Sequence, residues 1–100
     1  MKDTRYTQLA ELLVRHSLNL EAGGKVLIEA FDIPTDFTTE LIRVVAEAGG
    51  LPIVSTYHVP VQRAVIRHAT EEQMKTIGAI ERQRMESVQY YIGLRGSFNI

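Results

Sequence analysis

The chain has 100 residues, of which 45% are hydrophobic and 23% are charged, a composition typical of one globular domain with a modest core. Eleven Lys and Arg residues against twelve Asp and Glu residues give a net charge of -1, which disfavours binding to nucleic acid. The chain contains no cysteine, which excludes disulfides, thiolate metal sites and cysteine nucleophiles. No stretch approaches the roughly 18 apolar residues of a membrane span, and the N-terminal segment lacks the apolar region of a secretory signal. We therefore expect a soluble, cytoplasmic protein that does not bind membranes.

Predicted helices and strands alternate along the chain. In chain order we predict a helix over residues 3–20, a strand over 25–30, a helix over 37–48, a strand over 51–57, a short helix over 58–68, a helix from the capping residue 70 to about 85, and a strand over 88–94. The first strand, KVLIEA, places three apolar residues in a row, as in a strand that is covered on both faces.

Short signals mark the ends of several elements. Glycine pairs at 23–24 and 49–50 precede the first two strands, where a left-handed backbone is inexpensive for glycine. Thr70 and Gln73 have the form of a capping box, in which each side chain bonds the backbone of the other residue. Gly78 is expected to loosen the helix that follows this box.

Strands that alternate with helices predict an α/β fold, with a parallel β-sheet and helices on both faces. Right-handed crossovers join the strands of such βαβ units. Three strands are few for a parallel sheet, which needs cover on both faces and protected edges. We therefore expect residues 1–100 to form an N-terminal α/β domain of a larger two-domain protein, a fragment that ends just after its third strand.

In an open parallel sheet, ligands bind outside the carboxyl ends of the strands. The loops expected there carry Asp32, His58, Arg95, Ser97 and Asn99. None of them has the glycine pattern of a phosphate-binding loop, which disfavours nucleotide binding. Arginine, serine and asparagine beside a flexible glycine are suited to binding a carboxylate or a peptide backbone. The loop after the third strand is therefore the predicted substrate-binding segment, with Arg95, Ser97 and Asn99 as its candidates.

Other residue types that often carry chemistry have a structural explanation here. The histidines at 16, 58 and 68 show neither helical i, i+4 pairing nor an HExxH pattern, and no cluster of carboxylates accompanies them, so we predict no metal site within this segment. Glu71 and Glu72 stand in the first turn of a predicted helix, where negative charge favours the helix dipole. The serines lack the GxSxG pattern of a nucleophile. We therefore expect no catalytic residue in the segment.

Five short motifs follow one another in a characteristic order along the chain. They are LAELLV in the opening helix, GKVLI at the start of the first strand, AGG before PIV at the second strand, ATEEQ at a helix start, and YIGLRGS at the third strand. In this order and at these separations, the chain resembles the N-terminal domain of the thermophilic-type metal-dependent aminopeptidases, the aminopeptidase T and aminopeptidase S family of leucyl aminopeptidases. The resemblance covers essentially the whole chain.

The resemblance implies a two-domain metallopeptidase, usually a homodimer, that removes N-terminal residues from peptide substrates. It also implies two divalent metal ions, zinc or cobalt, with an activated water between them. In that family the metal ligands are Glu, His, Tyr and Asp residues of the C-terminal domain, and no position of this sequence matches them. The present segment would then shape the substrate cavity and support dimerisation.

Two alternatives stay open at this stage. One is a self-sufficient α/β binding or scaffold module resembling a truncated receiver domain, although such a domain needs clustered acids at its strand ends and only Asp32 is placed there. The other is the related front domain of a metal-dependent, ring-cleaving dioxygenase that acts on dihydroxypyridine. The sequence beyond Ile100 would separate an enzyme with a ligand-rich continuation from a module that ends there.

Overall fold

The computed structural model describes residues 4–96 of the chain. Its elements in chain order are the helix α1 (Thr4–Glu11), the π-helix η1 (Leu12–Ser17), the strand β1 (Lys25–Phe31), the helix α2 (Thr35–Glu47), the strand β2 (Leu51–Tyr57), the helices α3 (Val59–His68) and α4 (Glu71–Glu86), and the strand β3 (Tyr90–Arg95). None of these helices is long and apolar enough to cross a membrane.

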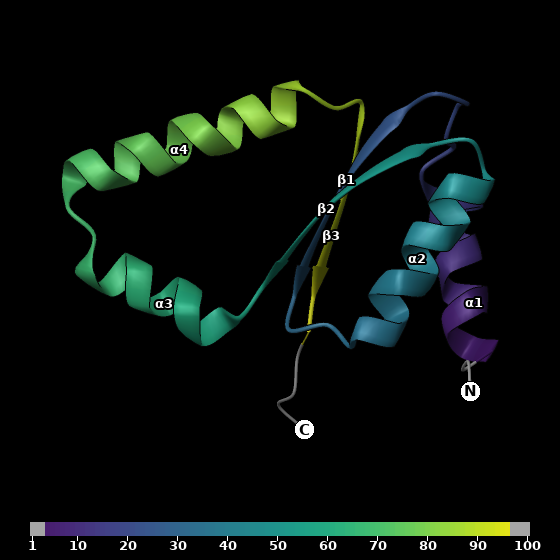
Figure 1. The fold of residues 1–100 in the computed structure, drawn as a ribbon, viewed down its shortest axis with the longest axis horizontal. Helices are drawn as coiled ribbons and strands as arrows, with labels where there is room; N and C mark the ends of the chain where they lie inside the picture. Colours follow the sequence, from purple (N-terminus) through teal and green to yellow (C-terminus); the bar gives the residue numbers. More distant parts are fainter. Residues whose placement is uncertain (1–3, 97–100) are drawn as a thin grey trace.

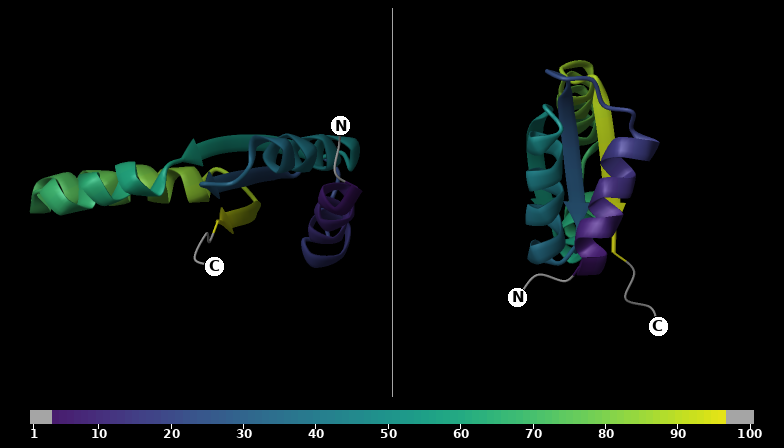
Figure 2. Two further views of the ribbon diagram at one scale, coloured as in Figure 1. Left: turned by 90° about the horizontal axis from the view of Figure 1, so that it is seen from below. Right: turned by 90° about the vertical axis from the view of Figure 1, so that its right-hand side faces the viewer.

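The three strands form one parallel sheet in the order β2-β1-β3, with β1 in the middle (Figure 1). The sheet divides the helices into two groups. α1 and α2 lie on one side of the strands, and α3 and α4 project from the other side (Figures 1 and 2). The α/β class, the parallel sheet and the helices on both faces are therefore confirmed.

The hydrophobic core fills the space between the sheet and the first helices. Val26 and Ile28 point from β1 into this core, because alternate residues of a strand face opposite sides of the sheet. The other buried members of the cluster come from α1, η1, α2 and β3: Ala10, Val14, Phe37, Leu41, Val44, Val45 and Ile92. The continuous burial of β1 agrees with the prediction of a strand covered on both faces.

Several predicted boundaries agree with the structure. β2 occupies the predicted residues, and α3 begins one residue later than predicted. α2 begins at Thr35, two residues earlier than expected. The third strand runs over residues 90–95 instead of 88–94, so Arg95 is its last residue and does not lie in the following loop. The reason is pairing, since Phe31 at the end of β1 lies opposite Arg95 in the parallel register.

Two local features differ from the expectations. The opening helix changes to π-type hydrogen bonding over η1, where the Leu18 amide donates to the Leu13 carbonyl at 2.9 Å. Asp3, the first residue of the predicted helix, lies outside the described residues. α4 continues without interruption through Gly78, so this glycine does not break the helix; a single glycine lowers helix stability by about 1 kcal/mol without breaking the hydrogen bonds.

The arm, defined as the residues of α3 and α4 with the turn between them (residues 59–86), stands away from the core (Figure 1). No residue of either helix is buried. The radius of gyration is 15.1 Å, larger than the roughly 13 Å typical of a 100-residue domain. The arm accounts for this elongation, because it extends beyond the layer formed by the sheet and its covering helices (Figure 2).

Candidate site at the strand carboxyl ends

The register of the sheet aligns Phe31, Tyr57 and Arg95 across the ends of the three strands. The rings of Phe31 and Tyr57 are stacked, with centroids 4.6 Å apart and an interplanar angle of 15°. The guanidinium carbon of Arg95 lies 4.2 Å from the Phe31 centroid, a cation–π contact. A planar cation is thereby held at the edge of the sheet where ligands bind in folds of this type.

Asp32 organises the adjacent loop. It follows β1 directly and has a left-handed backbone with φ of 56°, which aspartate tolerates better than most residues. One carboxylate oxygen lies 3.3 Å from Nδ1 of His58, and the other accepts from the Val59 amide at 3.2 Å. Since α3 has no side-chain cap of its own, Asp32 satisfies a free amide at its start. The structure thus brings Asp32 and His58 together, and it leaves the imidazole 82% exposed.

Of the three predicted substrate-binding residues, the structure places Arg95. It is exposed, beside the aromatic stack at the strand ends. Ser97 and Asn99 lie outside the described residues. A cavity of about 310 Å³ opens next to this edge, on the side of α2, with Asp32, Thr38, Thr56 and His58 among its lining residues.

The sequence analysis missed a buried carboxylate two register positions before the strand ends. Glu29 in β1 is 6% exposed. Tyr91 donates to one of its oxygens at 2.9 Å and Tyr57 to the other at 3.2 Å. Nη2 of Arg84, from α4, lies 3.5 Å from the same carboxylate and also donates to Ser55 Oγ. These partners surround a charge that would be expensive to bury alone.

This arrangement raises the pKa of both hydroxyls. Burial raises the pKa of Tyr91 above its ordinary value, and its hydrogen bond to the Glu29 carboxylate adds to the effect. Burial also raises the pKa of Tyr57; a hydrogen bond with Ser55 offsets part of this rise, and the charge of Glu29 reinforces it. Both tyrosines therefore remain neutral hydrogen-bond donors over the whole physiological pH range.

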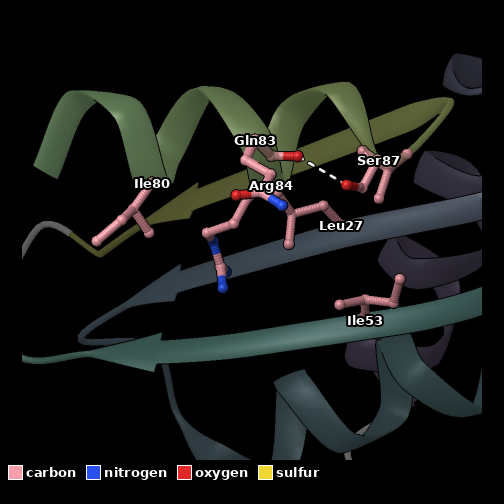
Figure 3. Close-up of a pocket in the computed structure, with 7 residues that line it drawn as sticks. Leu27, Ile53, Ile80, Gln83, Arg84 and Ser87 are labelled. Carbon is pink, nitrogen blue, oxygen red and sulfur yellow. Dashed lines mark hydrogen bonds between the residues drawn. The ribbon is translucent and has the colours of Figure 1, made fainter. Parts of the chain in front are cut away.

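A second cavity, of about 270 Å³, lies between α4 and the arm-facing side of the sheet (Figure 3). Its lining residues are Leu27, Ile53, Ile80, Gln83, Arg84, Ser87 and Val88. Arg84 reaches from the helix towards the strands, and Ser87 donates to the Gln83 carbonyl at 2.7 Å (Figure 3). Nε of Arg84 lies 4.0 Å from the Glu81 carboxylate, within ion-pair range but too far for a hydrogen bond. The cavity shows that the helix does not close fully against the sheet.

The fold is a parallel α/β domain, and it belongs to the class of such domains that carry polar side chains at the carboxyl ends of their strands. The profile of the thermophilic metalloprotease (M29) family matches residues 2–98, so the chain belongs to that family. The resemblance found in the sequence motifs is thereby confirmed. Among curated proteins, none matches this chain.

A metalloprotease family implies a divalent metal ion, which must be held by a cluster of donor side chains. Asp32 and His58 form a pair, but within residues 4–96 no three or more His, Asp or Glu residues gather where they could hold a metal ion. A metal centre of the kind that activates water needs about three protein ligands. The described part of the chain therefore does not fit the metal centre of a metallopeptidase.

Proposed function

We propose that this segment is the N-terminal, non-metal-binding portion of a metal-dependent aminopeptidase that hydrolyses N-terminal residues from peptides. Two divalent ions, zinc or cobalt, would be held by a C-terminal domain that follows residues 1–100. The segment would shape the substrate cavity and support a homodimer in the cytoplasm. The match of the M29 family profile to residues 2–98 is the observation that carries this proposal.

The surface of the arm supports a position against further polypeptide. Large apolar side chains are exposed along both of its helices, among them Val61, Ile66, Met74 and Ile80. On the sheet face beneath the arm, Ile53 is 42% exposed. Where exposed apolar side chains form a patch, the patch usually marks an interface. A second domain or a second subunit of the enzyme would remove this surface from water.

We further propose that Arg95 contacts the substrate, together with Ser97 and Asn99. Stacking on Phe31 fixes the plane of the Arg95 guanidinium, while its exposed position leaves the group accessible to a ligand. A fixed guanidinium is well suited to a carboxylate or a peptide carbonyl, because its N–H groups form two parallel hydrogen bonds.

The test uses the polypeptide encoded by the complete gene. We expect release of the first residue from peptides with a free amino group, loss of this activity with a chelator, and recovery on addition of Zn²⁺ or Co²⁺. N-acetylated versions of the same peptides are the matched control and should not be cleaved. The sequence after Ile100 should supply the Glu, His, Tyr and Asp ligands that a two-metal centre requires.

Three outcomes would contradict the proposal. Residues 1–100 alone could cleave peptides in a chelator-sensitive way, or bind Zn²⁺ with submicromolar affinity. The complete polypeptide could cleave the blocked peptides as well as the free ones. Oxygen-dependent ring opening of a dihydroxypyridine, without peptide hydrolysis, would assign the domain to the dioxygenase alternative.

A further inference from the structure

The arm consists of two helices that are joined by a short turn. A complete capping box begins α4, with the Gln73 amide donating to Thr70 Oγ1 at 3.0 Å and the Thr70 amide donating to Gln73 Oε1 at 3.4 Å. No residue of α3 or α4 is buried, so the arm lacks the packing that would hold it rigidly to the sheet.

Polar contacts instead attach the arm to the sheet near each of its ends. At the start of α3, Asp32 accepts from the Val59 amide. Near the end of α4, Arg84 forms an ion pair with Glu29 and donates to Ser55. The first contact joins a side-chain carboxylate to a backbone amide beside the connection from β2 to α3. The second joins side chains of α4 and the sheet, away from any chain connection. The arm could therefore turn about the first contact when the second contact is broken.

A cavity beneath α4 leaves space between the arm and the sheet. The 270 Å³ cavity separates Ile80 of the arm from Leu27 and Ile53 of the sheet (Figure 3). Ile80 is 54% exposed and Ile53 is 42% exposed. Closing the arm onto the sheet would bury these two side chains, which favours closure by roughly 25 cal/mol per Å² of apolar surface. Arg84 opposes a large movement as long as it remains bound to the buried carboxylate.

We propose that the arm is a hinged unit, which pivots where Asp32 holds the start of α3 and is latched to the sheet by the contact of Arg84 with Glu29 and Ser55. Glu29 is held for this contact by Tyr57 and Tyr91 from the two outer strands. Because Asp32 also contacts His58, movement of the arm changes the strand-end edge. The inference rests on the described residues alone and does not depend on a peptidase role.

Hydrogen–deuterium exchange of the complete chain tests the latch. A charge-assisted hydrogen bond contributes about 1.5–3 kcal/mol, so Arg84→Gln should speed amide exchange in the arm by about tenfold or more. Exchange in β1 and α2 should stay unchanged. Arg82→Gln is the matched control, since it removes an exposed arginine from the same helix and should leave the arm as in the wild type.

Glu29→Gln provides a second, independent variant. It keeps one acceptor oxygen, for one of the two tyrosines, and removes the charge opposite Arg84, and it should speed exchange of the arm by about threefold. An arm that is unprotected in the wild type, an unchanged arm in Arg84→Gln, or an equal rise in β1 and α2 in both variants would overturn the latch. The last outcome would mean that the contact supports the whole fold.

Discussion

The Tyr91 side chain lies directly over the Cα of Gly93. A Cβ built at position 93 would come within 2.7 Å of Tyr91 Oη and within 2.9 Å of its ring. The missing side chain of Gly93 therefore gives Tyr91 the path along β3 by which its hydroxyl reaches Glu29 at 2.9 Å. The glycine is required by this close approach, and a positive φ is not involved.

The first prediction follows from this contact. Gly93→Ala should push the Tyr91 ring aside, break its hydrogen bond to Glu29, and lower the free energy of unfolding by about 1 kcal/mol. Gly78→Ala is the control, because a Cβ there meets nothing within 4 Å; in a helix interior it should raise stability by about 0.5–1 kcal/mol. Urea unfolding measures both. If Gly93→Ala is equally destabilising in a Tyr91→Phe background, the displaced hydroxyl is not the cause.

The second prediction concerns alkaline pH. The folded state raises the pKa of Tyr57 and Tyr91, so it binds their protons more tightly than the unfolded chain does. Stability from this source is fully present below the unfolded pKa of about 10 and is lost as the pH rises through the folded pKa values. The urea concentration at the unfolding midpoint should decrease as the pH rises above about 10. Tyrosinate absorbance should appear at a higher pH in the folded protein than in the unfolded chain. A Tyr57→Phe, Tyr91→Phe double variant with the same alkaline slope would refute this origin.

The third prediction concerns the contact between the first two helices. Thr7 of α1 donates to Glu40 of α2 at 2.6 Å, and the Glu40 residue is 6% exposed. Arg43 bonds Glu40 and also Glu47, which raises the pKa of the arginine. Glu40→Ala should lower the free energy of unfolding by about 1–3 kcal/mol, because a buried hydrogen-bonding network loses its acceptor.

Glu47→Ala is the matched control for that change. Glu47 pairs with the same arginine from the same helix, but its side chain is 55% exposed, and such pairs contribute about 0–1 kcal/mol. Thermal or urea unfolding should therefore separate the two variants clearly. Equal effects would show that Thr7 and burial add nothing to the role of Glu40.

The fourth prediction tests Arg95 as a substrate contact in the complete enzyme. Arg95→Ala should lower kcat/KM for peptides by about 10- to 100-fold, the equivalent of one or two charge-assisted hydrogen bonds. The melting temperature should change little, because an exposed cation–π contact contributes about 0.5–1 kcal/mol. Phe31→Leu is a useful companion, since it removes the stacking surface and keeps the cation. Unchanged kcat/KM in Arg95→Ala would reduce the residue to a structural role.

Local chemistry allowed much of the fold to be predicted. The consecutive apolar residues of β1 identify a strand that is covered on both faces, and the apolar residues at the start of β2 identify a second strand. Gly49 ends α2 with φ of 91°, a conformation for which glycine is the least strained residue. Thr70 and Gln73 form the expected capping box. Each of these features depends on residues within a few positions of one another.

The site was only partly predictable for the opposite reason. Glu29 is a charged residue inside an apolar strand, a signal that the sequence analysis did not use, and its partners come from β2, β3 and α4, between 28 and 62 residues away. The true end of β3 was missed because the strand is defined by pairing with β1. The π-type hydrogen bonds of η1 left no mark in the helical spacing, which continues through it.

By itself, the sequence determined the order and type of the elements and the parallel sheet, since these follow from local patterns of apolar, glycine and capping residues, and its motifs gave the resemblance to the family. Only the tertiary structure decided that Phe31, Tyr57 and Arg95 meet at one edge and that Tyr57, Tyr91 and Arg84 enclose Glu29. The physical reason is that contacts across a sheet depend on strand order and register. A shift of one residue in register would turn each of these side chains to the opposite face.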